Sequence, residues 1–213
     1  MIDTLVVLAK EPRPGFAKTR LTPPLSALDA SLVAAACLQD TLDAVSRTPA
    51  RRRLLAFDGD AAGWLPHGWE LVEQPDGGLD ERIAAAFDAA GAGSALLVGM
   101  DTPQLQPRQL LAFDPARHEA ALGLAPDGGF WALGLRDARR GRAAVLGVPM
   151  SRSSTGAAQY AQLQVEGLRP TLLDTLADID TVDDLFAVAA DAPLGRLRVV
   201  LAEIAPRLVG RVS

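Results

Sequence analysis

The chain has 213 residues, of which 49% are hydrophobic and 22% charged, so it can bury a full core and is not intrinsically disordered. Its formal net charge of −5 excludes a long basic face for nucleic acid, and its single cysteine, Cys37, excludes an intramolecular disulfide and a cysteine-based zinc site. The first apolar run, residues 5–9, is far too short to span a membrane and has no basic leader before it. We therefore expect a cytoplasmic protein that binds neither nucleic acid nor membrane.

Short apolar segments predict β-strands along most of the chain, at residues 5–9, 54–57, 70–73, 95–98, 120–124, 131–135 and 171–173. The first and fourth are apolar without alternation, which is typical of parallel strands covered on both faces. Segments of helical period lie between the early strands. This alternation predicts an α/β fold, with a mostly parallel sheet that carries helices on both faces, in one domain spanning residues 1–213.

Apolar residues at helical spacing predict four helices. One begins after Ser26, and its apolar stripe is expected at Leu28, Leu32, Ala35, Leu42 and Val45; the next carries Leu79, Ile83, Ala86 and Ala90. Thr181 and Asp184 resemble a capping box that opens a short helix to about residue 190. After a break at Pro193, an amphipathic helix from about Leu194 either packs on the sheet or forms a dimer contact; its apolar positions are Leu197, Leu201, Ile204 and Leu208.

The loop after the first strand is the first place to look for a ligand site, because ligands of open α/β sheets bind beyond the carboxyl ends of the strands. It lacks the glycines of a dinucleotide fingerprint, and Ala17 stands where a P-loop has glycine before Lys18-Thr19. It nevertheless places four cations within eleven residues, Lys10, Arg13, Lys18 and Arg20. This concentration of positive charge favours a diphosphate or triphosphate site, and a solvated basic loop is the alternative.

Acidic side chains follow in the middle and the last third of the chain. Asp101 follows the apolar strand 95–98 after two residues, where it could hold Mg²⁺ or cap a turn that begins at Pro103. Asp178 and Asp180 precede the capped helix and could complete the same metal site.

Two small polar segments are candidates for binding an acceptor. The glycines of Asp127-Gly128-Gly129 allow close approach of a ligand to the backbone, although a tight turn would use them equally well. The hydroxyls at Ser151, Ser153, Ser154 and Thr155 lead into a helix that runs to about Gln164, where they could hold an anionic acceptor or cap the helix.

In their order and spacing, several motifs resemble one known family. They are Lys10-Glu11-Pro-x-Pro-Gly-x-x-Lys18-Thr19-Arg20-Leu21, Leu79-x-Glu81-Arg82, Gly99-x-Asp101-x-Pro103, Asp127-Gly-Gly-Phe-Trp and Asp178-Ile-Asp180-Thr-x-x-Asp184-Leu185. Over residues 4–186 the chain resembles the rSAM/selenodomain-associated transferases, a GT-A-fold group related to 2-phospho-L-lactate guanylyltransferase and to molybdenum-cofactor nucleotidyltransferases. It departs from that family at Asp80, where the family has glycine, and at Met150-Ser151-Arg152, where it has Trp-Ser-Thr.

The resemblance implies a GT-A fold, a nucleotide in the first loop, and Mg²⁺ or Mn²⁺ on Asp101 with Asp178 or Asp180 as second ligand. The implied catalytic cations are Lys10, Lys18 and Arg20. The implied nucleotide site comprises Ala9, Lys10, Pro14, Gly15, Lys18, Arg20, Gln74, Arg82 and Asp101. The acceptor is expected at Asp127, Gly128, Gly129, Ser151, Ser153 and Ser154.

The expected activity is Mg²⁺-dependent nucleotidyl transfer from a nucleoside triphosphate to a small anionic acceptor, with release of pyrophosphate. One alternative is a GT-A glycosyltransferase with a nucleotide-sugar donor. Such enzymes usually present D-x-D at the metal position, whereas Asp101-Thr102-Pro103 offers a single aspartate. The other alternative is a catalytically silent nucleotide-binding domain. The base, the acceptor and the oligomeric state, including a homodimer, remain open.

Overall fold

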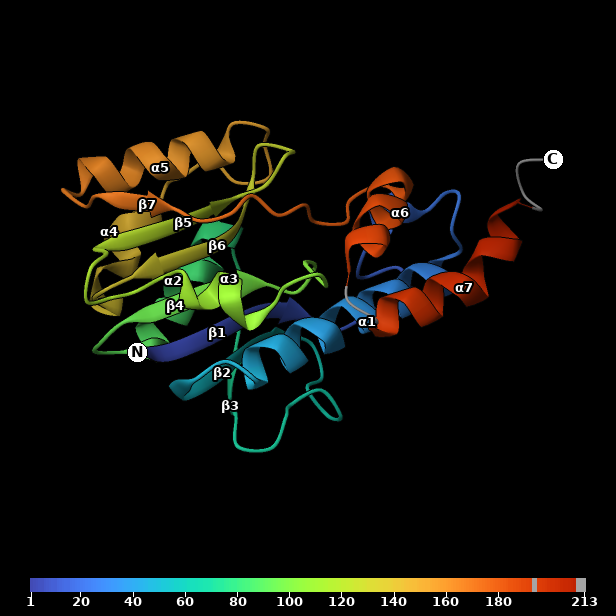
Figure 1. Ribbon diagram of the computed structural model, residues 1–213, viewed down its shortest axis with the longest axis horizontal. Coiled ribbons are helices and arrows are strands. Elements are labelled where there is room, and N and C mark those ends of the chain that lie inside the picture. The colour runs from blue at the N-terminus through green and yellow to red at the C-terminus, as the bar shows by residue number, and fades with distance from the viewer. Residues whose placement is uncertain (193–194, 210–213) are drawn as a thin grey trace.

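The computed structural model describes residues 1–192 and 195–209, and within these residues seven strands form one sheet in the order β3-β2-β1-β4-β6-β5-β7 (Figure 1). The strands are β1 (Ile2–Lys10), β2 (Ala50–Asp58), β3 (Glu70–Glu73), β4 (Ala95–Gly99), β5 (Ala120–Leu124), β6 (Phe130–Leu135) and β7 (Pro170–Leu172). All pairings are parallel except those of β6, which runs antiparallel to both β4 and β5. The predicted mostly parallel sheet is confirmed.

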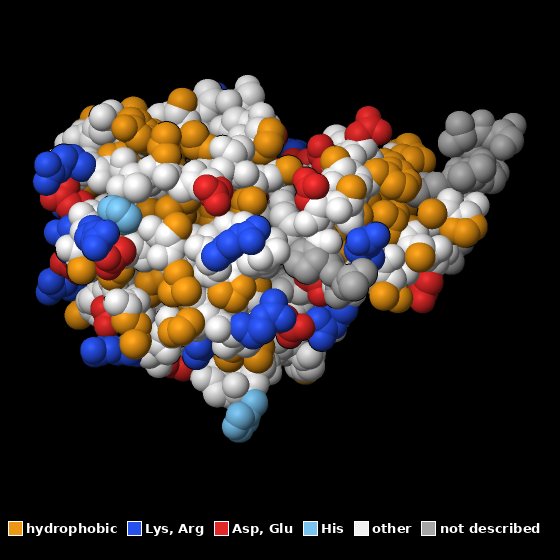
Figure 2. Space-filling model, in the orientation of Figure 1, with side chains coloured by type: hydrophobic (Ala, Val, Ile, Leu, Met, Phe, Trp, Pro, Cys, Tyr) orange, Lys and Arg blue, Asp and Glu red, His pale blue; other side chains and the backbone are white. Residues whose placement is uncertain are grey.

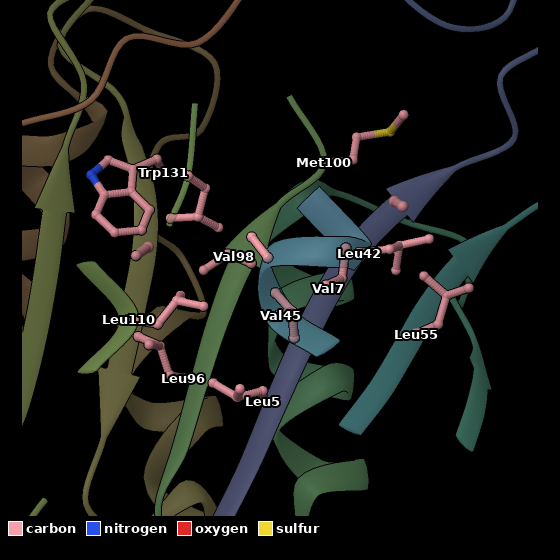
Figure 3. Close-up of a cluster of buried hydrophobic side chains, with 14 of the residues drawn as sticks. Leu5, Val7, Leu42, Val45, Leu55, Leu96, Val98, Met100, Leu110 and Trp131 are labelled. Carbon is pink, nitrogen blue, oxygen red and sulfur yellow. The ribbon is translucent and has the colours of Figure 1, made fainter. Parts of the chain in front are cut away.

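Helices cover both faces of this sheet, as predicted. One face packs against α1 (Ala27–Ser46) and α3 (Pro107–Leu111), and the other against α2 (Leu79–Ala90), α4 (Gly141–Val145) and α5 (Thr155–Val165). Short 3₁₀ turns, η1 (Thr19–Leu21) and η2 (Ala138–Arg140), lie beside them. Figure 3 shows the first of these layers, in which Leu5 and Val7 of β1 face Leu42 and Val45 of α1. Each such buried side chain contributes about 1.5–3 kcal/mol.

The predicted apolar stripe of α1 is partly wrong. Leu28 is 60% exposed and Leu32 is 38% exposed, whereas Leu42 packs toward the sheet and Cys37 is buried on another side of the helix. Helix α1 is covered twice, by the sheet and by the C-terminal helices α6 (Val182–Asp191) and α7 (Arg196–Val209). Because two sides of the helix are apolar, hydrophobic periodicity alone does not identify the exposed one.

The C-terminal helix α7 packs on α1 and not on the sheet. Its side chains Leu197 and Ile204 are buried in a cluster with side chains of α1 and α6. Pro193, Leu194 and the side chain of Leu208 lie outside the described residues. In Figure 1 this helix extends beyond the sheet, and Figure 2 shows hydrophobic side chains at the surface of α6 and α7, where Phe186 and Val199 are exposed. None of the described helices is long and apolar enough to cross a membrane.

Between β7 and α6 lies a stretch without regular secondary structure, residues 173–180, which we call the strap. Backbone N–H groups of Leu173 and Leu176 donate to Leu122 and Leu124 of β5, so the strap leaves the sheet at the carboxyl end of β5. It then crosses to α6 (Figure 1). The capping box predicted at the start of α6 is confirmed: Thr181 Oγ1 accepts a hydrogen bond from the Asp184 backbone N–H.

Candidate functional site

The topology brings the polar segments to one edge of the sheet. The first loop follows β1, and the segment with Asp101 follows its parallel neighbour β4, so both begin at carboxyl ends of adjacent strands. Strand β6 is antiparallel, so the turn that precedes it, Asp127-Gly128-Gly129, lies at the same edge. The strap adds Asp178 and Asp180. This is the edge at which open α/β sheets bind their ligands.

Lys18 joins the first loop to both acidic segments. Its Nζ lies 2.9 Å from Asp101 Oδ2 and 4.0 Å from Asp180 Oδ1, and it also donates to the backbone carbonyl of Ile179. The Lys18 side chain is only 8% exposed. Burial alone would lower the pKa of Lys18, but the neighbouring groups together, chiefly the charge and hydrogen bond of Asp101 with a smaller contribution from Asp180, outweigh burial and hold the pKa above its ordinary value of 10.5. Lys18 is therefore a charged lysine whose donors face the protein.

Three aspartates form a group that could hold a metal ion. Asp127, Asp178 and Asp180 each offer a carboxylate oxygen, and these oxygens lie within 4.8 Å of one another. Burial, followed by repulsion from Asp101 and the other two carboxylates, raises the pKa of Asp178 to about 6. A set of oxygen donors alone, crowded with negative charge, fits a hard divalent cation such as Mg²⁺ or Mn²⁺.

The composition of this acidic group differs from the set expected from the sequence. Asp127 was expected at the acceptor site, whereas the structure places it with Asp178 and Asp180. Asp101 lies beside them, and its carboxylate is engaged by Lys18. A turn does begin at Pro103, closed by the bond from the Leu105 N–H to the Thr102 carbonyl at 3.0 Å, but among the described residues the hydrogen bond of the Asp101 carboxylate is to Lys18 and not to the backbone of that turn.

The expected nucleotide-binding residues near β2 and β3 form a hydrogen-bonded cluster. Gln74 Nε2 donates to the carbonyls of Ala9 at 2.7 Å and Ala56 at 2.8 Å. Arg82 pairs with Asp58, with 2.6 Å between its Nη1 and the Asp58 Oδ2. Asp58 was missed by the sequence analysis, although it ends β2 directly opposite Lys10 of β1. Its position at a strand end is the signal that could have identified it.

The remaining cations of the first loop are open to solvent. Lys10, Arg13 and Arg20 are exposed, as are Pro14 and Gly15. The ring of Phe16 lies 4.2 Å from the Arg13 guanidinium carbon and 5.5 Å from Lys10 Nζ, so it holds both cations over its faces. Gly15 has a φ of 75°, which lets the loop turn back here. Arg20 Nη1 contacts Asp180 Oδ2 at 2.6 Å.

The turn before β6 is fixed against the start of α5. Gly128 has a φ of 89°, and a Cβ added there would lie 1.9 Å from the backbone oxygen of Ser153. The Gly156 N–H donates to the Gly128 carbonyl at 2.7 Å, and the Gly129 N–H donates to Asp127 Oδ1 at 2.8 Å. Only glycine fits this approach, and the contact sets the place of Asp127.

The serines before α5 do not cap it. Ser151, Ser153 and Ser154 are exposed, and within the described part of the chain the N-cap residue Ser154 makes no side-chain capping bond. The hydroxyl of Thr155, the fourth of these residues, instead accepts from the Arg152 N–H at 3.0 Å and donates to the Pro149 carbonyl at 2.8 Å. The serine hydroxyls thus remain at the surface beside the fixed turn.

Comparison with known proteins identifies a family and a fold. The model of the family DUF2064, described as an uncharacterized protein conserved in bacteria, matches residues 32–152, more than half of the chain. No curated protein is significantly similar in sequence. The fold resembles that of a Desulfovibrio desulfuricans protein provisionally assigned as a nucleotide-diphospho-sugar transferase, with a TM-score of 0.87 over 99% of both chains at 23% identity.

Two further solved structures share the fold at larger distance. One is 2-C-methyl-D-erythritol 4-phosphate cytidylyltransferase from Thermus thermophilus, with a TM-score of 0.57 at 18% identity over 89% of this chain and 98% of the other. The other is a Mycobacterium tuberculosis protein in complex with manganese, with a TM-score of 0.50 at 19% identity over 87% of this chain and 97% of the other. The predicted fold, that of nucleotide-diphospho-sugar transferases and nucleotidyltransferases, is thereby confirmed.

Proposed function

Because the chain belongs to the DUF2064 family and has the fold of nucleotide-diphospho-sugar transferases and nucleotidyltransferases, we propose that it is a transferase that acts on a nucleotide with the aid of a divalent cation. In its specific form the proposal is nucleotidyl transfer from a nucleoside triphosphate to a small anionic acceptor, with release of pyrophosphate. The observation that carries it is the convergence of cations from the first loop with the aspartates of three later segments at one sheet edge.

Mg²⁺ or Mn²⁺ is the proposed cofactor, held by Asp127, Asp178 and Asp180 with Asp101 beside them. A bound divalent ion would neutralise negative charge on the phosphates and relieve the repulsion between carboxylates that, after burial, raises the pKa of Asp178. The fit of these residues rests on their close oxygen donors. The manganese complex of the similarly folded mycobacterial protein supports the choice of ion.

The nucleotide is proposed to lie along the first loop, near Ala9, Pro14, Gly15, Gln74 and Arg82. Lys10 and Arg20 are exposed and can reach phosphate oxygens. Lys18 is buried, and its role in the proposal is to hold the carboxylates of Asp101 and Asp180 in place. In-line phosphoryl transfer needs little covalent chemistry from the protein, so positioning and charge neutralisation carry most of the catalysis.

The acceptor is proposed to bind at Gly128, Gly129 and the exposed hydroxyls of Ser151, Ser153 and Ser154 beside Asp127. Glycosyl transfer from a nucleotide-sugar is the second candidate, and the structural similarity to the Desulfovibrio protein favours it. The similarly folded cytidylyltransferase favours nucleotidyl transfer. The single aspartate of Asp101-Thr102-Pro103 does not separate the two activities, because the proposed metal ligands lie on other segments. Closer kinship with the rSAM/selenodomain-associated transferases, a single domain over residues 1–213 and a cytoplasmic location belong to the same proposal.

Thermal unfolding in the presence of ligands tests the proposed function. Nucleoside triphosphates and nucleotide-sugars are compared with and without Mg²⁺ or Mn²⁺, and a true ligand at one hundred times its Kd stabilises the protein by about 2.7 kcal/mol. Metal-dependent stabilisation by triphosphates supports nucleotidyl transfer, and selectivity for nucleotide-sugars supports glycosyl transfer. A protein that responds to neither class contradicts both. Asp127→Asn should lose the metal dependence, whereas the matched control Asp76→Asn, an exposed carboxylate, should retain it.

Labelling gives an independent check, because Lys10 and Lys18 are the only lysines in the sequence. A periodate-oxidised nucleoside triphosphate forms a Schiff base with a nearby lysine, which borohydride traps. We expect labelling at Lys10 and protection of the buried Lys18. Unmodified triphosphate should compete with the label. Labelling at the N-terminal amine alone would contradict a nucleotide site in the first loop.

A further inference from the structure

The strap that carries Asp178 and Asp180 is held by side chains from three different segments. Trp131 of β6 donates its indole N–H to the Asp174 carbonyl at 3.0 Å, and Gln104 donates its Nε2 to the Ala177 carbonyl at 2.5 Å. Lys18 donates to a third carbonyl on the strap. The strap has no helix or strand of its own, and its backbone bonds to β5 end at Leu176, so beyond that residue the side-chain bonds from Gln104 and Lys18 help to fix its path.

Gln104 holds the strap next to its first aspartate. The Ala177 carbonyl belongs to the peptide unit directly before Asp178, so the amide of Gln104 acts on the backbone that orients this side chain. Gln104 is itself buried, in the segment that follows Asp101. Its Oε1 is buried without a hydrogen-bond partner among the described residues. The donor end of the amide therefore binds the strap while its buried acceptor end is unpaired among the described residues, which is unfavourable for a buried polar atom.

We infer that Gln104 is a positioning residue, whose amide holds the strap where Asp178 and Asp180 can bind a divalent cation together with Asp127. The inference rests on the metal centre of the proposed function. Its physical basis is that a small cation tolerates little error in the placement of its oxygen ligands. Groups that orient metal ligands typically change the affinity for the metal about 10–100-fold when they are removed.

The chain contains a closely matched control for Gln104. Gln159 of α5 is also buried, donates its Nε2 to a backbone carbonyl, that of Ala144 at 2.7 Å, and has a buried Oε1 without a partner among the described residues. Its bond joins α5 to α4 and not to the strap. Replacing either glutamine by methionine removes one donor at nearly constant volume. Only Gln104→Met removes a bond to the strap.

The test measures Mn²⁺ binding to the full chain by electron paramagnetic resonance, without nucleotide, together with hydrogen exchange of the strap amides. For Gln104→Met we expect a Kd for Mn²⁺ at least tenfold weaker than that of the wild type, and faster exchange over residues 174–180. For Gln159→Met we expect a wild-type Kd and wild-type exchange of the strap. Gln104→Asn keeps the amide but shortens its reach, so it tests the same bond if the methionine variant does not fold.

Other results overturn the inference. If Gln104→Met binds Mn²⁺ as tightly as the wild type, the bond to Ala177 does not set the metal site. If both glutamine variants lose affinity equally, general loosening of the protein explains the loss. A wild-type protein that binds no Mn²⁺ refutes the metal centre itself, and with it this use of Gln104. That failure differs visibly from the first two, in which the wild type binds Mn²⁺.

Discussion

Replacing Asp178 by asparagine should make the metal-free protein more stable at neutral pH, although it removes a proposed metal ligand. Burial and the neighbouring carboxylates raise the pKa of Asp178 from 3.8 to about 6. The folded protein therefore binds more protons than the unfolded chain between these values, and its stability falls as the pH rises through that window. Above pH 6 the full cost of the charged carboxylate is present, and below about pH 3.8 it is absent.

The size of this cost follows from the two pKa values. At about 1.4 kcal/mol for each pKa unit, the difference corresponds to at most about 3 kcal/mol. Asp178 retains some contact with solvent, which screens the repulsion, so we expect Asp178→Asn to gain about 1–2 kcal/mol at pH 7.5. The gain should fade as the pH approaches 4, because the wild-type carboxylate is then protonated as well.

Urea unfolding in EDTA, for the wild type and Asp178→Asn, measures the gain in the free energy of unfolding at pH 7.5 and its loss at pH 4. A second series with Mn²⁺ should reverse the order, because the wild type gains about 2.7 kcal/mol at one hundred times its Kd and the variant gains much less. Asp76→Asn removes the same charge at an exposed site and should show neither effect. If Asp178→Asn is no more stable than the wild type at pH 7.5, or if its gain in stability is equal at both pH values, the charged Asp178 carboxylate does not destabilise the metal-free protein as argued.

Three further variants test other parts of the structure by urea unfolding. Lys18→Met should cost about 2 kcal/mol in EDTA, because its partner carboxylates lose their buried counter-charge; an unchanged midpoint would show that the ion pair is not formed. Gly128→Ala should lower the free energy of unfolding by about 1–3 kcal/mol, because its backbone has a positive φ and the added Cβ would clash with the Ser153 carbonyl. Wild-type stability of this variant would contradict the tight turn. Hydrogen bonds from Ser94 hold the pKa of Asp3 below 3.8, so Asp3→Asn should be less stable than the wild type at pH 7, with a difference that disappears as the pH falls below that value; a constant difference would exclude this cause.

The hydrophobic pattern of the sequence predicted where strands and helices lie. Which side of a helix is buried depends on the elements that pack around it. Runs such as residues 5–9 and 95–98 predicted strands correctly because their apolar side chains must be covered on both faces. The exposed side of α1, by contrast, was predicted wrongly at Leu28 and Leu32. Two layers compete for that helix, and the second consists of helices more than 130 residues further along the chain.

The α/β fold, the strand positions and the polar segments at the carboxyl ends of the parallel strands could be predicted from the amino-acid sequence, because they follow from the local hydrophobic period and the chain direction. Which carboxylates come together could not be predicted in this way and depends on the three-dimensional packing. Strand β6 runs antiparallel and so brings Asp127 to the edge that Asp178 and Asp180 reach through the strap. The packing also buries Lys18 against Asp101. Strand direction and side-chain burial are set by partners distant in sequence, whose identity no local pattern contains.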